Sequence, residues 1–174
     1  MGKRRKLDAY YTPKWAAQEL LNHIKFEPMD VILEPCSGDN VITDVLVEDG
    51  SAWVVNNDID ESKIAEWNLD ATEAELYDFT EPDWVITNPP FSKALEIVSL
   101  AKARATSGVA MLLRLSFLEP TYSRQTWLVD NPPNKLIVLP RISFTGDGKT
   151  DSVTCGWLIW DKSGENFIKV VAKD

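Results

Sequence analysis

Short runs of apolar residues alternate with segments of helical periodicity along most of the chain. The apolar runs predict eight β-strands, at residues 31–35, 52–58, 74–79, 84–88, 109–115, 135–139, 156–161 and 167–173. The helical spacing predicts helices within residues 14–25, 40–48, 61–68, 92–105 and 121–129. Near-continuous apolar strands separated by helices indicate an α/β fold with a mostly parallel central sheet and helices on both faces. The last two predicted strands have no helix between them, so a hairpin there would add an antiparallel edge strand.

The composition of the chain bears on its cellular location and on the metal and disulfide sites that it could carry. Two cysteines and one histidine argue against a disulfide framework and a zinc cluster. Arg114 interrupts the longest apolar stretch, which is too short to span a bilayer. No apolar run follows the basic residues 3–6, as a secretory signal would require. We therefore expect a cytoplasmic protein with no membrane partner and no metal.

The charge of the chain is unevenly distributed. A net charge of −9 argues against a protein that coats nucleic acid in general, because phosphate binding depends on lysine and arginine. Residues 3–6 and 141–149 are nevertheless locally basic. They could form a rim that holds nucleic acid, or they are simply a solvated tail and a solvated loop.

Polar residues follow the first two predicted strands, where ligands bind in open α/β sheets. Glu34 closes the first strand, and Gly38 in the following turn lets a ligand approach the backbone closely. The turn lacks the Gly-x-Gly-x-x-Gly pattern, which argues against a dinucleotide site. Asp58 ends the second strand, where a carboxylate can accept hydrogen bonds from two ribose hydroxyls. Asp60 competes with Asp58 for that role, and either residue could instead cap a helix.

Asp78 and Phe79 end the predicted strand 74–79. An acceptor and a flat apolar ring at a strand end suit the amine and the face of an adenine. The alternative is a turn aspartate followed by a core phenylalanine.

The stretch Asn88-Pro89-Pro90-Phe91 follows the next predicted strand. The Asn88 side-chain oxygen and the Pro89 carbonyl can accept both hydrogen bonds of an exocyclic amine, on a loop that the prolines stiffen. Phe91 can stack on a base taken out of its helix. The same tripeptide recurs at residues 131–133, but there it follows a predicted helix and precedes Asn134. That copy is most simply a helix-to-strand turn.

Together these segments resemble S-adenosylmethionine-dependent amino-methyltransferases with an Asn-Pro-Pro-aromatic motif, especially phage-type DNA adenine-N6 methyltransferases. The resemblance covers most of the chain and comprises five segments in order, which are "YYTPKWAAQELL", "LEPCSGDN", "NNDID", "YDFT" and "TNPPF". It implies a Rossmann-like class I methyltransferase domain over residues 1–174, with S-adenosylmethionine as cofactor and S-adenosylhomocysteine as product.

The resemblance also assigns roles to individual residues. Asn88, Pro89, Pro90 and Phe91 would hold the target amine, and no covalent nucleophile is implied. Ile59 would lie against the adenine of the cofactor. The other implied cofactor-binding residues are Tyr11, Thr12, Pro13, Glu34, Pro35, Cys36, Gly38, Asp58, Asp78, Phe79 and again Asn88. The resemblance also implies the cytoplasm of a bacterium or of a phage-infected cell.

The late segment 139–152 resembles a loop of the phage-type enzymes. Arg141 and Lys149 could meet phosphate there, and Phe144 could stack on or wedge between bases. The alternative is a plain surface hairpin loop.

Two departures bear on the substrate. Asn40 stands where many relatives have a second glycine, and 174 residues leave no room for a separate target-recognition domain. The same motif serves RNA adenine-N6 and protein glutamine methyltransferases, and the fold can persist in a binding protein without activity. Phe91 in place of tyrosine favours a base over a protein amide, and the resemblance to the phage-type enzymes favours DNA over RNA. The acidic balance favours a partner subunit, a homodimer or a weak local contact with nucleic acid.

Overall fold

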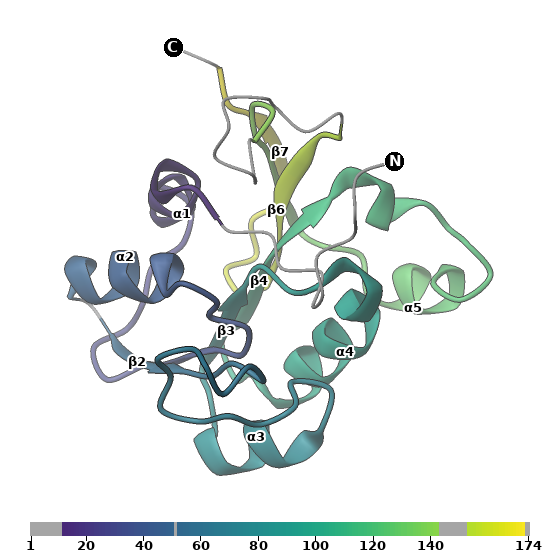
Figure 1. Cartoon of the computed structure of the whole chain (residues 1–174). Helices are drawn as coiled ribbons and strands as arrows, with labels where there is room; N and C mark the ends of the chain where they lie inside the picture. Colours follow the sequence, from purple (N-terminus) through teal and green to yellow (C-terminus); the bar gives the residue numbers. More distant parts are fainter. Residues whose placement is uncertain (1–11, 51, 143–152, 173–174) are drawn as a thin grey trace.

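A seven-stranded sheet forms the centre of the computed structural model, which describes residues 12–50, 52–142 and 153–172 (Figure 1). The strands are β1 (Val31–Glu34), β2 (Trp53–Asn56), β3 (Trp84–Thr87), β4 (Gly108–Arg114), β5 (Lys135–Val138), β6 (Cys155–Asp161) and β7 (Phe167–Val170). Their order across the sheet is β2-β1-β3-β4-β6-β5-β7. All neighbouring pairs are parallel except those that β6 makes with β4 and β5. The predicted mostly parallel sheet is therefore confirmed.

Helices cover both faces of this sheet, as the alternation of strands and helices predicts (Figure 1). They are α1 (Lys14–Leu21), α2 (Val41–Asp49), α3 (Ala74–Thr80), α4 (Ala94–Arg104) and α5 (Gln125–Asp130), with the 3-10 turns η1 (Phe91–Lys93) and η2 (Leu115–Leu118). One core lies between the sheet and α1 and α2, and the other lies under α3 and α4. No helix in the described part of the chain has the length and apolarity that crossing a membrane requires.

The antiparallel strand lies inside the sheet and not at its edge, which corrects the predicted hairpin. Strand β6 is inserted between β4 and β5, while the edge strand β7 runs parallel to β5. Six of the seven residues of β6 are buried, so this strand needs neighbours on both sides. Gly156 makes the close packing possible, because a Cβ atom there would lie 2.6 Å from the carbonyl oxygen of Ile137.

Two other element predictions are wrong, and they concern adjacent segments. Residues 74–79 form helix α3 and not a strand, because alanine, glutamate and leucine favour helix and the helical turn buries Leu76 and Tyr77 together. Residues 61–68 form no helix. This segment instead runs along the edge of β2, where Glu66 N donates to the carbonyl of Asn56 at 3.2 Å and Trp67 forms an isolated parallel bridge with Asn57.

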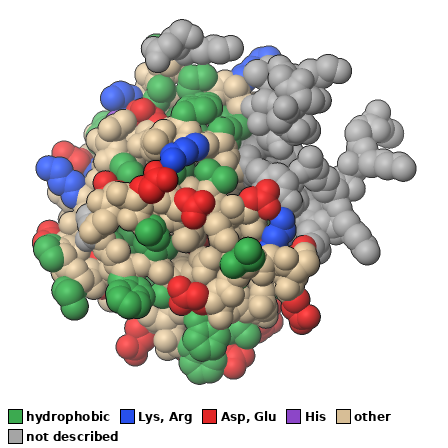
Figure 2. Space-filling view, turned by 60° about the vertical axis from the view of Figure 1, so that its left-hand side comes forward, with side chains coloured by type: hydrophobic (Ala, Val, Ile, Leu, Met, Phe, Trp, Pro, Cys, Tyr) green, Lys and Arg blue, Asp and Glu red, His purple; other side chains and the backbone are tan. Residues whose placement is uncertain are grey.

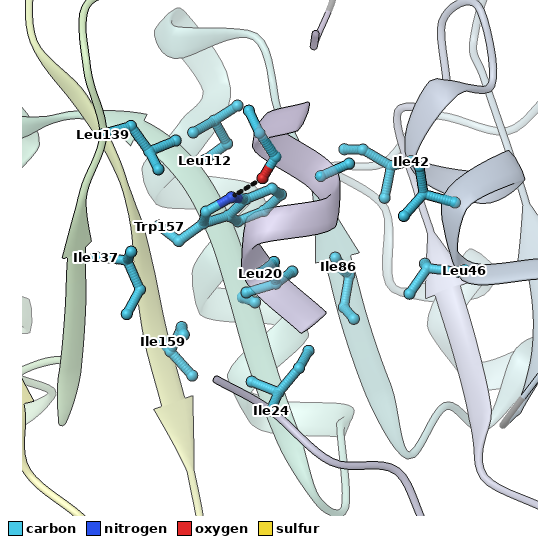
Figure 3. Close-up of a cluster of buried hydrophobic side chains, with 14 of the residues drawn as sticks. Leu20, Ile24, Ile42, Leu46, Ile86, Leu112, Ile137, Leu139, Trp157 and Ile159 are labelled. Carbon is cyan, nitrogen blue, oxygen red and sulfur yellow. Dashed lines mark hydrogen bonds between the residues drawn. The ribbon is translucent and has the colours of Figure 1, made fainter. Parts of the chain in front are cut away.

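Trp157 of β6 anchors α1 on the sheet (Figure 3). Its side chain is fully buried, and its indole Nε1 donates a hydrogen bond of 2.8 Å to the carbonyl of Ala16 in α1. Figure 3 shows Leu20 and Ile24 from this N-terminal segment packed among aliphatic side chains of the strands. The contact holds α1 beside the sheet.

We expect Trp157→Phe to lower the free energy of unfolding by about 1–3 kcal/mol, because it removes ring volume and one hydrogen bond from the core. Urea unfolding followed by circular dichroism measures the change. Trp53 is 71% exposed and provides the matched control. Trp53→Phe should change stability by less than about 0.5 kcal/mol. Equal losses in the two variants would contradict the role given to Trp157.

Candidate cofactor and substrate site

Parallel pairing places the carboxyl ends of β1, β2 and β3 in a row, and this row of strand ends is the edge of the sheet at which the candidate site lies. Glu34 at the end of β1 lies beside Asn56 of β2, and Leu33 lies beside Val85 of β3. The turns that follow these strands carry most of the residues implied by the resemblance. They include Gly38, Asp58 and Asn88, so these residues meet at one edge of the sheet.

The turn after β1 is tied directly to the end of β2. Gly38 has a φ of 55°, a conformation that costs glycine little, and its N–H donates to Oδ2 of Asp58 at 2.7 Å. The N–H of Asp60 donates to the other oxygen, Oδ1, at 2.9 Å. Each carboxylate oxygen can accept more than one hydrogen bond, so Asp58 is oriented and still able to accept from a ligand.

Asp60 is engaged in a turn of its own. Its Oδ1 accepts hydrogen bonds from the backbone N–H and the hydroxyl of Ser62, at 3.0 and 2.7 Å. These two bonds lower the pKa of the Asp60 carboxyl. Because residues 61–68 form no helix, the helix-capping alternative is wrong for Asp60, whose carboxylate instead closes a local turn with Ser62.

Glu34 is a buried carboxyl, only 1% exposed. Its Oε2 accepts hydrogen bonds from the N–H and the hydroxyl of Thr43 in α2, at 2.8 and 2.5 Å. Burial outweighs these bonds and, with a smaller contribution from the charge of Asp58, raises the pKa of Glu34 to about 8. The group is therefore mostly protonated near neutral pH, and a cation nearby would favour its ionised form.

The N-terminal segment reaches the end of β3. Nδ2 of Asn88 donates to Oγ1 of Thr12 at 3.2 Å, across 76 positions of sequence. Thr12 is buried, and Pro13 precedes the first turn of α1. The structure thus brings Thr12 and Pro13 to the site, while Tyr11 lies outside the described residues.

The loop after β3 is stiff and half-buried. Pro89 is buried, and Asn88, Pro90 and Phe91 are partly exposed. Phe91 begins the short turn η1, and the guanidinium carbon of Arg114 lies 4.4 Å from the centroid of its ring. An asparagine and an aromatic ring are therefore both presented at the strand end.

The second Asn-Pro-Pro copy, residues 131–133, lies at the amino ends of the parallel strands, directly before β5 begins. Asn131 is the C-cap of α5, and its Nδ2 donates to the carbonyl of Trp127 at 3.0 Å. Its own carbonyl accepts a hydrogen bond from the Trp160 indole, also at 3.0 Å. The prediction of a helix-to-strand turn is confirmed for this copy.

Asp78 and Phe79 are not at a strand end, which corrects the prediction for them. Both lie in α3, where Asp78 forms an ion pair of 2.6 Å with Arg104, the last residue of α4. Since α4 ends just before β4 begins, this pair lies toward the amino ends of the strands. Phe79 is 60% exposed and stacks on Trp67, with ring centroids 6.1 Å apart.

Asp70 follows the segment beside β2, which hydrogen bonds between Asn57 and Leu69 hold in place. Its Oδ1 accepts hydrogen bonds from the N–H and the hydroxyl of Thr72, at 2.8 and 2.7 Å, and these bonds lower the pKa of the Asp70 carboxyl. Burial and, to a smaller extent, the charges of Asp58, Glu34 and Asp70 raise the pKa of the Cys36 thiol, which indicates that Asp70 lies near the turn after β1. The sequence analysis did not single out Asp70, because the incorrect strand prediction at 74–79 directed attention to Asp78.

Of the remaining residues that the sequence predicts for the site, three lie at this edge, one follows β5 and two lie outside the described residues. Pro35 is buried, Cys36 is half-buried, and Ile59 is 54% exposed at the same edge. Arg141 is exposed and follows the end of β5. Phe144 and Lys149 lie outside the described residues.

Charge is distributed unequally around this edge. Acidic side chains are spread over the face on the α1, α2 and β2 side of the molecule (Figure 2). Arg114 and Arg141 lie instead at the ends of β4 and β5. Among the described residues, no group of three or more histidine, cysteine, aspartate or glutamate side chains could hold a metal ion.

Solved structures with the same fold include several methyltransferases. No protein-family model and no curated protein sequence matches the chain. A protein from Vibrio vulnificus, provisionally named as the modification subunit of a type I restriction enzyme, superposes with a TM-score of 0.69 at 13% identity over 95% of this chain. A provisionally named class I S-adenosylmethionine-dependent methyltransferase from Listeria monocytogenes gives 0.64 at 14% identity over 90%. A provisionally named RNA methyltransferase from Pyrococcus horikoshii gives 0.64 at 18% identity over 92%.

The lengths of these proteins differ from that of this chain. The chain spans 48% of the Vibrio protein, 63% of the Listeria protein and 91% of the Pyrococcus protein. The identities are low, so the likeness concerns the fold. 

Glu34 makes the stability of the protein dependent on pH. Its pKa is raised from 4.5 to about 8 on folding, so its stabilising contribution is full below pH 4.5 and is lost as the pH rises to about 8. We expect Glu34→Gln, which stays neutral, to gain stability relative to the natural protein by up to a few kcal/mol between pH 5 and 9. Urea unfolding of both proteins across this range measures the difference. Parallel pH profiles would contradict the raised pKa.

Taken together, the strand order, the helices on both faces and these superpositions show that the chain has the Rossmann-like fold of class I methyltransferases.

Proposed function

We propose that the chain transfers a methyl group from S-adenosylmethionine to the exocyclic amine of a nucleobase, namely adenine N6 in DNA. The observation that carries this proposal is the position of the stiff loop Asn88–Phe91 at the sheet edge that also holds Glu34 and Asp58. A fold supports many functions, so the argument rests on this site and not on the superpositions.

The residues at this edge fit the cofactor chemically. Asp58 offers carboxylate oxygens that suit a ribose diol, and the φ of 55° at Gly38 suits a turn that a ligand approaches closely. Glu34 can ionise beside a positively charged ligand, because a nearby cation lowers the pKa of a buried carboxyl. A molecule that carries both a diol and positive charge matches this set. We propose that Asp70, and not Asp78, accepts the amine of its adenine, beside Ile59.

Asn88 and Pro89 would act on the target nitrogen. S-adenosylmethionine supplies an activated methyl group on a positively charged sulfur. The lone pair of an exocyclic amine is delocalised into its ring, so two fixed acceptors that grip the N–H groups make the nitrogen more nucleophilic. The side-chain oxygen of Asn88 and the carbonyl of Pro89 are suited to this, and the tie between Asn88 and Thr12 fixes the orientation of the amide. Catalysis then comes from orientation and preorganised dipoles.

The target base would stack on Phe91 after leaving its helix. Arg114 and Arg141 supply positive charge on the β4 and β5 side of the edge, where a phosphate backbone can pass. The Vibrio and Pyrococcus proteins are named for nucleic-acid modification and RNA methylation, which supports a nucleic-acid substrate. Since the Vibrio protein is about twice as long as the part that superposes, a partner subunit or a second copy could supply target recognition here.

Transfer of tritiated methyl groups tests the substrate class. Duplex DNA, single-stranded DNA, RNA and a protein extract are offered separately, and the labelled product is digested and identified. We expect N6-methyl-2′-deoxyadenosine from DNA. Label in RNA adenine or in glutamine would move the function to one of the two alternative substrates, and no label in any of them would favour a binding protein without activity.

We expect Asn88→Ala to lower the rate of methyl transfer by about 100-fold or more, because the amine loses one of its two fixed acceptors. Binding of the cofactor should be largely unchanged. Asn131→Ala is the matched control, because it changes the same tripeptide at the opposite edge of the sheet. Initial rates of both variants provide the measurement. Undiminished transfer by Asn88→Ala would remove this loop from the catalytic site.

Cofactor affinity distinguishes Asp70 from Asp78. We expect Asp70→Asn to weaken binding of S-adenosylhomocysteine by roughly 5–30-fold, and Asp58→Ala to weaken it by at least as much, since each loses a charged acceptor for a ligand group. Asp78→Asn is the control and should leave affinity unchanged, because Asp78 is paired with Arg104. Isothermal titration calorimetry measures all three. A weaker complex with Asp78→Asn alone would restore the original assignment.

A further inference from the structure

We propose that the α3 side of the outermost strand β2 is a docking surface for an arginine-rich segment of a partner protein. This surface, the aromatic face, consists of the rings of Trp53, Trp67 and Phe79 and the carboxylates of Glu66 and Glu75. None of these residues belongs to the candidate site for methyl transfer. The inference is therefore independent of the proposed function.

Strand β2 and helix α3 bring the three rings to the same side of the sheet. Val55 of β2 packs in the core under α3 and α4, whereas Val54 packs in the other core. Because side chains alternate along a strand, Trp53 lies on the same side as Val55 and therefore on the side of α3. Phe79 belongs to α3 and stacks on Trp67, with ring centroids 6.1 Å apart and an interplanar angle of 26°.

All three rings are open to solvent. Trp53 is 71% exposed, Phe79 is 60% exposed and Trp67 is 42% exposed. Large aromatic side chains usually bury most of their surface, and exposed apolar side chains that occur together mark an interaction site. Tryptophan is also among the residues that contribute most to binding at protein interfaces. The aromatic face thus has the composition of the centre of an interface.

Negative charge is concentrated in the same part of the chain. Residues 58–83, which include Trp67 and Phe79, hold ten of the 27 acidic residues and one of the 18 lysines and arginines. The rest of the chain has 17 of each, so this segment accounts for the whole net charge of −9. Figure 2 shows hydrophobic side chains interspersed with acidic ones on the β2 side of the molecule.

Two carboxylates of this segment are close to the rings in the chain. Glu66 precedes Trp67 directly, and Glu75 lies one helical turn before Phe79, so the two side chains are neighbours on α3. Both carboxylates are exposed. Neither forms an ion pair with a lysine or arginine in the described part of the chain. They are available to a cation from outside.

Arginine matches both features of the aromatic face. Its planar guanidinium stacks on aromatic rings, and tryptophan is the ring that attracts a cation most strongly. The same group binds a carboxylate through two parallel hydrogen bonds. Lysine offers only a compact charge, so it would gain less from the rings. The combination of exposed rings and unpaired carboxylates therefore favours arginine side chains of a partner.

The charge argues against two other occupants. A nucleic acid would be repelled, because its phosphates bind to lysine and arginine. A second copy in a symmetric dimer would bring the same surface against itself, and like charges would then meet across the interface. A basic protein surface has neither difficulty.

Binding of fluorescently labelled hexa-arginine and hexalysine peptides to the full chain tests the inference. Anisotropy titrations are made at low ionic strength, because salt screens contacts between exposed charges. We expect hexa-arginine to bind at least about fivefold more tightly than hexalysine, since the two peptides carry the same charge and differ in the planar group.

Variants locate the binding surface. Phe79→Ala and Glu75→Gln should each weaken binding of hexa-arginine by about fivefold or more. The controls are Tyr122→Ala, at a ring that is 96% exposed outside the aromatic face, and Glu119→Gln, at an exposed carboxylate outside it. Both controls should stay within about twofold of the natural protein. Thermal unfolding shows whether each variant is folded, and Trp53→Ala provides a second test of the rings.

Several results would overturn the inference. They are equal affinity for the two peptides, unchanged binding in Phe79→Ala and Glu75→Gln, and equal losses in the two controls. Weaker binding of duplex DNA by Phe79→Ala would assign the face to nucleic acid instead. A dimer that sedimentation detects in the natural protein and not in Phe79→Ala would assign it to a second copy.

Discussion

Parallel pairing of β1 with β2 on one side and with β3 on the other is the constraint on which the site depends. It places the turns after three strands at one edge, although Glu34 and Asn88 are far apart in the sequence. The hydrogen bond from Gly38 N–H to Asp58 then joins the first two turns, and the bond from Asn88 to Thr12 joins the third to the N-terminal segment. The residues of the candidate site are thus oriented by the strand pairing and by these two hydrogen bonds.

Burial at this edge has an electrostatic consequence. Glu34 is retained as a buried carboxyl whose pKa is raised to about 8, which lowers stability at alkaline pH compared with a neutral residue. Such a group is expected at a functional site more often than in a purely structural core. Lysines accompany the acidic side chains on the α1, α2 and β2 side, as in the ion pairs Lys14–Glu48 and Lys63–Asp39, while Arg114 and Arg141 lie at the ends of β4 and β5.

Much of the architecture could be predicted from the sequence, because seven apolar runs of the right length correspond to the seven strands. The order of the strands could not. Strand β6 is interior because its residues are buried on both faces, which a hydrophobic run near the end of the chain does not reveal. Periodicity also failed at residues 74–79, where a short run fits a strand and a helix equally well, and packing of Leu76 and Tyr77 decides for the helix. Because of this error, the sequence analysis placed Asp78 at a strand end, whereas it lies in α3 and pairs with Arg104.

The candidate site was predicted best where the chemistry lies within a few consecutive residues. Asn88 to Phe91 could be recognised from a stiff, polar and aromatic stretch, and its copy at Asn131 could be set aside from its neighbours alone. The contact between Arg114 and Phe91 could not be found in this way, since it depends on which strand lies beside β3 and on the direction of one side chain.

A crystal structure with bound S-adenosylhomocysteine tests the central claim most directly. The account predicts the ribose hydroxyls at Asp58, the adenine amine at Asp70, and the sulfur facing the loop that contains Asn88. A ligand bound at another edge of the sheet, or with its sulfur directed away from Asn88, would contradict it.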